Sequence, residues 1–181
     1  MCSDMTSEII CAGFGGQGVL LMGQIVAYAG MIEGKNVSWL PSYGPEMRGG
    51  TANCCVIVSD APVGSPVVTE ADAVIVMNKP SLDKYESVLK PGGSLFINSS
   101  LIDKKATRSD VTVYYVPANE IASEVGNSRV ANIVMLGAFI ASSGIVSKES
   151  VIKAVEYVLG QGKAHLIPLN EKAFDEGAKC V

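Results

Sequence analysis

The residues best suited to chemistry lie near the N-terminus, where four glycines and a glutamine separate a short apolar run from an amphipathic run. Gly13, Gly15 and Gly18 have the G-x-G-x-x-G spacing, Gly16 adds a fourth position without a Cβ, and Gln17 stands between them. We call residues 13–18 the glycine loop. The pattern predicts a strand, a tight loop and a helix whose free amide groups and positive dipole end face the loop. Such a loop favours an anionic ligand.

The usual second half of a dinucleotide-binding fingerprint is missing. A nicotinamide fold places Asp or Glu at the end of its second strand, about 20 residues after the loop, where it holds the ribose hydroxyls. The second predicted strand, residues 36–40, runs into Pro41 and Ser42 without a carboxylate. NAD is therefore disfavoured. Two interpretations stay open: another phosphate-bearing ligand, or glycines that only let the strand and helix pack closely.

A second candidate site follows that strand. Residues 41–50, which we call the arginine loop, contain two prolines and three glycines together with Tyr43, Glu46, Arg48 and Gly49. This composition excludes a helix or strand. In a parallel sheet the loop would lie beside the glycine loop, at the edge where ligands of open α/β folds bind. Arg48 offers a planar fork for phosphate or carboxylate, and Glu46 would orient it. The alternative is a turn with a surface ion pair.

The remaining patterns predict an α/β protein with one domain, residues 1–181. We expect an open, mostly parallel, Rossmann-like sheet with helices on both faces. Further strands are expected at 51–59, 73–77, 94–98 and 111–116, and helices at 80–89, 118–125, 129–143, 147–159 and 170–179. Asn78 and Asn98 end two of the strands and would face the ligand edge, although either residue could instead cap a turn. The helix at 129–143 is apolar on all sides, which predicts burial on more than one side.

Composition points to a chain that works with other chains. The hydrophobic fraction is 48%, only 18% of residues are charged and the mean hydropathy is +0.31, so much apolar surface must be buried, in part against partners. The net charge of −4 argues against nucleic-acid binding. Two uncharged runs, 9–32 and 130–147, are interrupted by Gln, Asn, Ser and Gly, so we expect no membrane span. The first residues do not resemble a signal peptide, and a cytoplasmic location is expected.

The metal-binding and nucleophilic residue types are sparse. The five cysteines, Cys2, Cys11, Cys54, Cys55 and Cys180, form no C-x-x-C motif or paired cluster, so zinc and iron–sulfur ligation are not predicted. His165 is the only histidine, which excludes a histidine-based triad within this chain. We therefore predict no catalytic residue and no metal ligand.

Several motifs in order resemble the gamma subunit of 2-oxoacid:ferredoxin oxidoreductases and the equivalent domain of single-chain pyruvate:ferredoxin oxidoreductases. They are GFGGQG at 13–18, YGPEMRGG at 43–50, SDAPVGSP at 59–66, Asn78 and PGG at 91–93. The resemblance extends from about residue 9 to residue 174. It implies CoA-dependent oxidative decarboxylation of a 2-oxoacid such as pyruvate, 2-oxoglutarate or 2-ketoisovalerate to acyl-CoA, with reduction of ferredoxin.

The resemblance also implies a division of labour. The chain lacks the G-D-G motif of thiamine diphosphate sites and the cysteine clusters of iron–sulfur sites. Thiamine diphosphate, magnesium and iron–sulfur clusters are therefore expected in the alpha, beta and ferredoxin-like partner subunits. The chain by itself should be inactive and hold no cofactor, while its two loops complete the active-site cavity and contact coenzyme A. The YGPEMR loop favours the 2-oxoglutarate or branched-chain substrates.

Three alternatives stay open at this point. The chain could be a stand-alone nucleotide-binding oxidoreductase, against which the missing ribose carboxylate argues. It could instead be an assembly module whose loops form only subunit interfaces. A homodimer of the isolated chain, in place of the missing partners, is also consistent with the sequence.

Overall fold

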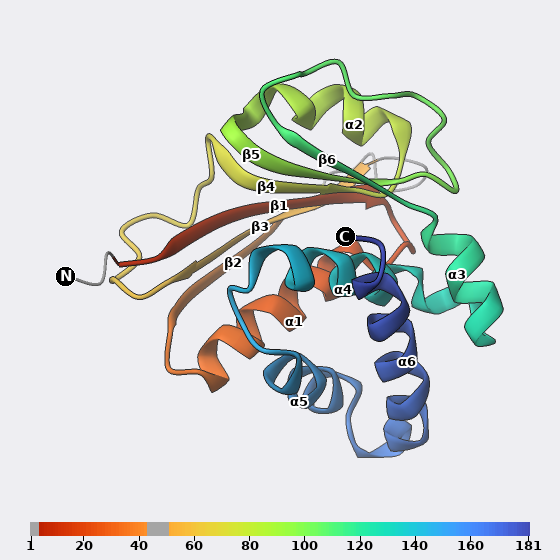
Figure 1. Cartoon of the computed structure of the whole chain (residues 1–181). Coiled ribbons are helices and arrows are strands. Elements are labelled where there is room, and N and C mark those ends of the chain that lie inside the picture. The colour runs from red at the N-terminus through yellow and green to blue at the C-terminus, as the bar shows by residue number, and fades with distance from the viewer. Residues whose placement is uncertain (1–3, 43–50) are drawn as a thin grey trace.

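The computed structural model describes residues 4–42 and 51–181, which form one sheet with helices on its two faces (Figure 1). The strands are β1 (Thr6–Phe14), β2 (Asn36–Ser42), β3 (Thr51–Ser59), β4 (Ala71–Val76), β5 (Leu89–Asn98) and β6 (Thr112–Val116). The helices are α1 (Val19–Ile32), α2 (Lys79–Tyr85), α3 (Ala118–Val125), α4 (Ala131–Ser143), α5 (Lys148–Leu159) and α6 (Ile167–Ala178). Three short 3₁₀ turns, η2 (Glu86–Val88), η3 (Ser128–Val130) and η4 (Gln161–Leu166), link helices to their neighbours.

The sheet is mostly parallel, as the sequence predicts. Its strand order is β2-β3-β1-β4-β5-β6. β1, β4, β5 and β6 pair in parallel, whereas β3 pairs antiparallel with both β1 and β2. β2 therefore points in the same direction as β1, and its carboxyl end lies at the edge that also carries the glycine loop.

The helices leave the sheet in opposite directions at its centre. α1 follows β1 onto one face, which α4, α5 and α6 also cover, while α2 follows β4 onto the other face (Figure 1). Because β1 and β4 are neighbours, this arrangement opens a crevice between their carboxyl ends. The glycine loop closes one side of that crevice.

α4 is the central helix of the larger helical layer. Every residue from 131 to 140 is buried, which confirms the prediction of a helix covered on more than one side. Its outer side packs closely on α6 at two glycines. A Cβ on Gly137 would lie 2.8 Å from the carbonyl carbon of Phe174, and a Cβ on Gly177 would lie 2.7 Å from that of Val134. Only glycine permits this approach of the two backbones.

Several element boundaries differ from the sequence-based predictions, among them those of β2, α2 and β5. β2 continues through Pro41 to Ser42, where a loop was expected, because β2 is an edge strand and proline need not donate to a further strand. The helix predicted to reach residue 89 ends at Tyr85, and β5 already begins at Leu89. Leu89 pairs with Ala71, and a register shift follows, so residues 91–93 are a bulged part of the strand rather than a connection.

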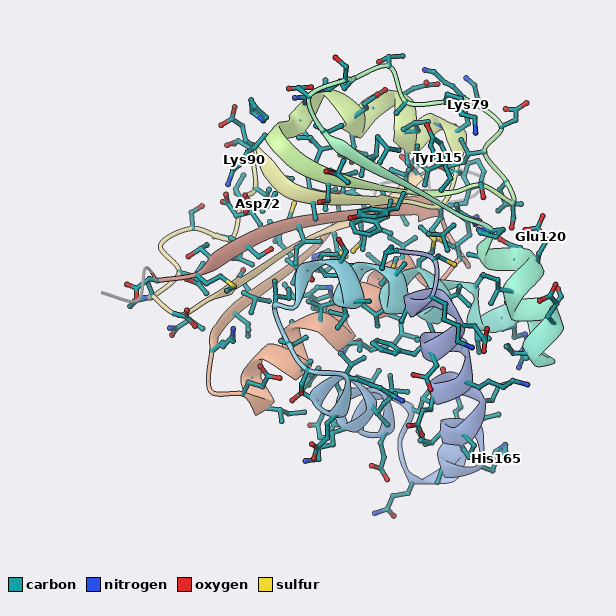
Figure 2. The ribbon with its side chains drawn as sticks, viewed as in Figure 1. Asp72, Lys79, Lys90, Tyr115, Glu120 and His165 are labelled. Carbon is teal, nitrogen blue, oxygen red and sulfur yellow. The ribbon has the colours of Figure 1, made fainter. Side chains whose placement is uncertain are left out.

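Ion pairs between side chains join the strands at the sheet edge opposite the glycine loop. The ammonium of Lys90 lies 2.6 Å from Glu8 Oε2 and 3.0 Å from Asp72 Oδ1, so three neighbouring strands are tied together. Figure 2 shows Lys90 beside Asp72, far from Glu120 at the other edge. Partial burial lowers the pKa of Lys90, but the two carboxylates outweigh it and the net shift is upward. These ion pairs join the amino-terminal parts of β1, β4 and β5.

Candidate functional site at the carboxyl edge of the sheet

The glycine loop joins β1 to α1 in the predicted order of strand, loop and helix. Gly18 is the N-cap of α1 and has a left-handed backbone, with φ of 73°. Among the described residues no side chain caps this helix, and its first turn contains no acidic residue. The amides of Val19, Leu20 and Leu21 have no acceptor within the helix, since the first intrahelical bond runs from Met22 to Gly18. The loop therefore presents the donors and the positive dipole end that an anion needs.

Gln17 holds the glycine loop against the crevice between β1 and β4. Its Oε1 accepts a hydrogen bond of 2.6 Å from the Phe14 amide, and its Nε2 donates to the Met77 carbonyl at 3.3 Å. Gly13 must lack a side chain because a Cβ there would lie 2.6 Å from Gln17 Oε1 and 2.8 Å from Met77 Cβ. The sequence left open whether the glycines allow close packing or bind a ligand. At Gly13 the close contacts show that glycine is required for packing.

Gly16 has a different environment from Gly13. Its φ is 91°, and a Cβ at this position would meet no atom of the described residues within 4 Å. Gly16 borders two hollows, one on each side of the loop. One measures about 280 Å³ and includes Gly15 and Ala52, and the other measures about 170 Å³ and includes Asn119. Space for a ligand thus exists on both sides of the loop's most open residue.

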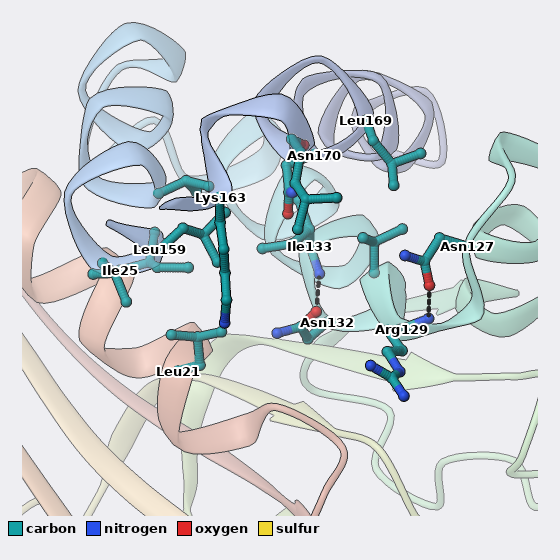
Figure 3. A pocket seen from close by; sticks show the side chains of 14 residues that line it. Leu21, Ile25, Asn127, Arg129, Asn132, Ile133, Leu159, Lys163, Leu169 and Asn170 are labelled. Carbon is teal, nitrogen blue, oxygen red and sulfur yellow. Dashed lines mark hydrogen bonds between the residues drawn. The ribbon is translucent and has the colours of Figure 1, made fainter. Parts of the chain in front are cut away.

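A basic residue that the sequence reasoning missed lies beside the glycine loop. Arg129, in η3, lines the 170 Å³ hollow together with Gly16 and Gln17. Asn127 positions this turn, since its Oδ1 accepts from the Arg129 amide at 3.0 Å (Figure 3). The arginine is exposed, and among residues 4–42 and 51–181 no carboxylate lies within 4.0 Å of its guanidinium. More than 100 residues separate it from the loop, so no local pattern could have revealed the proximity.

α4 is tied to the glycine loop through Asn132. Its Nδ2 donates to the Gly18 carbonyl at 3.2 Å, and its Oδ1 accepts from the Ile133 amide at 2.9 Å. A Cβ on Gly18 would contact the Asn132 amide nitrogen and lie 2.9 Å from Asn132 Cγ. The position of the loop therefore depends on a helix that is distant in sequence.

The predicted residues of the arginine loop, Tyr43, Glu46, Arg48 and Gly49, lie outside the residues that the structure describes. The two ends of the loop are described. Ser42 pairs with Asn53, and Thr51 pairs with Phe14 at the start of the glycine loop. The chain therefore leaves and re-enters the sheet at the edge where the glycine loop lies, as predicted. The roles of these four residues remain predictions.

Asn78 and Asn98 lie at the carboxyl ends of β4 and β5, and both are buried. Asn78 caps α2, because its Oδ1 accepts from the Ser81 amide at 2.9 Å. Its Nδ2 is buried without a partner among the described residues. Asn98 donates to Asn119 Oδ1 at 2.8 Å and so supports the wall of the smaller hollow. Both asparagines have a capping or bracing function, and a ligand contact of Asn78 stays a prediction.

The described cysteines are unpaired thiols that lie in the sheet and in the turn after α6. Cys11 and Cys54 face each other across β1 and β3. A hydrogen bond with Cys54 and complete burial raise the pKa of Cys11 well above its ordinary value, so it is not a reactive thiolate. Within the described part of the chain, no three His, Cys, Asp or Glu side chains are grouped to hold a metal ion. His165 is exposed on η4, far from the glycine loop (Figure 2).

Comparison with known families assigns the chain. The family described as pyruvate ferredoxin/flavodoxin oxidoreductase matches residues 8–180, nearly the whole sequence. The chain belongs to the pyruvate ferredoxin/flavodoxin oxidoreductase family. The match includes the glycine loop and the arginine loop, so the resemblance stated from these motifs is confirmed. No helix among the described residues is long and apolar enough to cross a membrane.

Relatives within this family are similar over most of the chain. The ketoisovalerate oxidoreductase subunit VorA of Methanothermobacter marburgensis is 41% identical over 169 residues, which are 92% of this chain and 35% of VorA. The 2-oxoglutarate synthase subunit KorC of Methanocaldococcus jannaschii is 41% identical over 154 residues, 83% of this chain and 82% of KorC. The chain thus spans about a third of the first relative and most of the second.

A solved structure has the same fold. The gamma subunit of a keto/oxoacid ferredoxin oxidoreductase from Geobacter sulfurreducens shares 37% identity and superimposes with a TM-score of 0.82, covering 96% of both chains. The predicted α/β class and the likeness to gamma subunits of this family are therefore confirmed.

Proposed function

We propose that this chain is the gamma subunit of a multi-subunit 2-oxoacid:ferredoxin oxidoreductase. It completes the site in which a 2-oxoacid is oxidatively decarboxylated with coenzyme A to acyl-CoA and carbon dioxide, and ferredoxin is reduced. The observation that carries this proposal is the family match over residues 8–180. The same domain forms 35% of VorA and corresponds to most of KorC, which fits a unit that works as part of a larger assembly.

The proposed partners are alpha, beta and ferredoxin-like subunits, with ferredoxin as the electron acceptor. Thiamine diphosphate, magnesium and iron–sulfur clusters belong to those subunits in this proposal. Thiamine diphosphate activates the substrate carbon when it is bound there. In this proposal the chain has a positioning role: the described residues that line the two hollows beside its glycine loop include no His, Cys, Asp, Glu or Lys.

The glycine loop is the proposed contact for a phosphate group of coenzyme A. Three features of the described residues support it: the amides at the start of α1 that no side chain caps, the open face of Gly16, and the Arg129 guanidinium, which pairs with none of their carboxylates. Arginine binds phosphate with two parallel hydrogen bonds, and a helix N-terminus adds its dipole. Arg48 and Tyr43 of the arginine loop are proposed to contact the same ligand. Gly13 and Gln17 hold the loop in shape.

The subunit assignment is tested by co-expression with the genes beside its own. The complex is purified through a tag on this chain, and viologen reduction is measured with pyruvate, 2-oxoglutarate and 2-ketoisovalerate in the presence and absence of coenzyme A. We expect CoA-dependent reduction by the copurified complex and none by the chain alone. If no partner copurifies and the lone chain binds NAD, NADP or FAD, the proposal is wrong and the stand-alone alternative is correct.

The coenzyme A contact is tested in the same complex with Gly16→Val, which places a side chain in the open space of the loop. We expect the apparent KM for coenzyme A to rise about tenfold or more, the cost of losing charge-assisted hydrogen bonds. Gly34→Val is the matched control, since Gly34 also has a positive φ, 75°, and open surroundings, but lies at the other end of α1. It introduces the same backbone strain far from the loop.

Arg129→Met removes the guanidinium and keeps an aliphatic side chain. We expect a similar rise in the KM for coenzyme A, while the exposed Lys172→Met on α6 leaves it unchanged. An intact complex with unchanged KM values for both Gly16→Val and Arg129→Met would refute the contact. The assembly-module alternative would then describe the loop, and Arg48→Ala would be expected to weaken assembly instead.

A further inference from the structure

A third hollow lies among the helices, and it shares Arg129 with the smaller hollow beside the glycine loop. It measures about 250 Å³ and lies between α1, α4, α5 and α6 (Figure 3). We call it the helical pocket. Aliphatic side chains from these helices form its walls, among them Leu21, Ile25, Ile133, Leu159 and Leu169. The walls provide an apolar environment for the body of a ligand.

The polar groups of the helical pocket are basic or neutral. Lys163 from η4 and Arg129 from η3 line it together with asparagines 127, 132 and 170. No Asp or Glu lines it, although the chain as a whole has 18 acidic and 14 basic residues. Among the described residues, no carboxylate lies within 4.0 Å of the Lys163 ammonium. The charge of the pocket is therefore complementary to an anion.

The two cationic groups lie on the same side of the helical pocket, with Asn132 between them (Figure 3). In Figure 3 the Lys163 side chain runs across the pocket, and its amino group ends near Leu21, on the side where Asn132 and Arg129 also lie. Asn132 is only 4% exposed, and its amide donates to the Gly18 carbonyl. This polar end therefore adjoins the glycine loop, while the aliphatic walls extend away from it.

We infer that the helical pocket binds a small amphipathic anion. The anionic head group is held at Lys163 and Arg129, and an aliphatic tail lies along the walls formed by α1, α4 and α5. A volume of about 250 Å³ accommodates roughly eight non-hydrogen atoms at about 30 Å³ each. A six-carbon monocarboxylate has this size. Both a carboxylate and a phosphate monoester provide the required charge, and the experiment separates them.

Binding of such an anion would act on the glycine loop through a short path. The head group would lie next to the Asn132 amide, which already fixes the Gly18 carbonyl. An anion that accepts a hydrogen bond from the Asn132 amide would change the bond from this amide to the Gly18 carbonyl, which positions the N-cap of α1. The inference does not rest on the proposed function, because binding can be measured without turnover.

The test is isothermal titration calorimetry on the full-length chain with four probes. Hexanoate has a carboxylate head group and an aliphatic tail, and hexyl phosphate has a phosphate head group on the same tail. Hexanol lacks the charge, and acetate lacks the tail. We expect one site for hexanoate, weakened by added salt, and affinities about tenfold or more lower for hexanol and acetate. Whichever of hexanoate and hexyl phosphate binds more tightly identifies the head group.

Two variants test whether the anion binds in the helical pocket. Lys163→Met removes the charge from an exposed side chain, so the fold is preserved, and Val158→Phe fills the pocket from its half-buried wall. Each should weaken hexanoate binding about tenfold or more, whereas Lys172→Met, outside the pocket, should not. Absence of binding by both hexanoate and hexyl phosphate overturns the inference. So does binding that survives both pocket variants, or binding that Lys172→Met weakens equally.

Discussion

The contact between Gly18 and Asn132 predicts how strongly the glycine loop depends on the helical layer. Gly18→Ala meets two obstacles. An L-residue with φ near 73° costs about 1–2 kcal/mol, because its Cβ crowds the following carbonyl oxygen. The new Cβ also collides with the Asn132 side chain, so the hydrogen bond to the Gly18 carbonyl is broken or displaced. That loss is about 1–3 kcal/mol for a buried amide.

The expected loss of unfolding free energy for Gly18→Ala is therefore about 3 kcal/mol in total. In a domain of this size it corresponds to a fall in Tm of about 6–12 °C. Gly16→Ala and Gly34→Ala have the same left-handed strain without a collision, so each should cost only about 1–2 kcal/mol. Urea unfolding followed by far-ultraviolet circular dichroism measures all three changes.

A double-mutant cycle isolates the contact. In an Asn132→Ala background the two nearest atoms, the amide nitrogen and Cγ, are gone and only the Cβ at 3.3 Å is left, so Gly18→Ala should cost little more than Gly16→Ala. The resulting coupling energy between positions 18 and 132 should be about 1–2 kcal/mol. If Gly18→Ala costs the same in both backgrounds, or no more than Gly16→Ala, the reasoning that α4 confines the loop is refuted.

Three further predictions concern packing and ionisation. Gly137→Ala should lower the free energy of unfolding by about 2 kcal/mol although alanine favours a helix, because its Cβ collides with the α6 backbone. Urea unfolding measures this loss, with Gly64→Ala, at an open position, as the control. Burial raises the pKa of Glu33, but hydrogen bonds from Ser147 and Ser150 and the charge of Lys35 outweigh it, so the net shift is downward. Its stabilising effect is present above the unfolded pKa of about 4.3 and disappears as pH falls through the folded pKa. In Glu33→Gln, Tm should therefore fall less than in the unsubstituted chain when the pH is lowered from about 5 to about 3. An equal fall of Tm in both proteins would contradict a stabilising role of the Glu33 carboxylate. Cys11 should react with iodoacetamide only after unfolding, as mass spectrometry of native and urea-treated chain would show, and labelling in the native state would contradict its burial.

Much of the fold was predictable because local patterns decide it. The run from apolar strand through glycines to helix predicted β1, the loop and α1, since strand and helix periodicities and the glycine positions are all local. The all-round apolar pattern of residues 131–140 predicted a central helix. Ser147 begins α5 as predicted because its side chain accepts from the Ser150 amide three residues later.

The failures occurred where partners distant in sequence decide. Pro41 argues against a strand on local grounds, but β2 lies at the edge of the sheet, where a proline is tolerated. Residues 91–93 look like a turn, yet pairing of Leu89 with Ala71 draws them into β5. In both cases strand pairing overrode a local preference.

The amino-acid sequence by itself determined the α/β class, the family and the loop that presents amide donors to an anion, because each depends on residue types at short spacing. Only the tertiary structure separated the glycines into those required for packing, such as Gly13 and Gly18, and the open Gly16. It also brought Arg129 and Asn132 to a loop more than 100 residues earlier in the chain. The physical reason is that the crevice and both hollows form between elements that meet only when helices pack on the sheet.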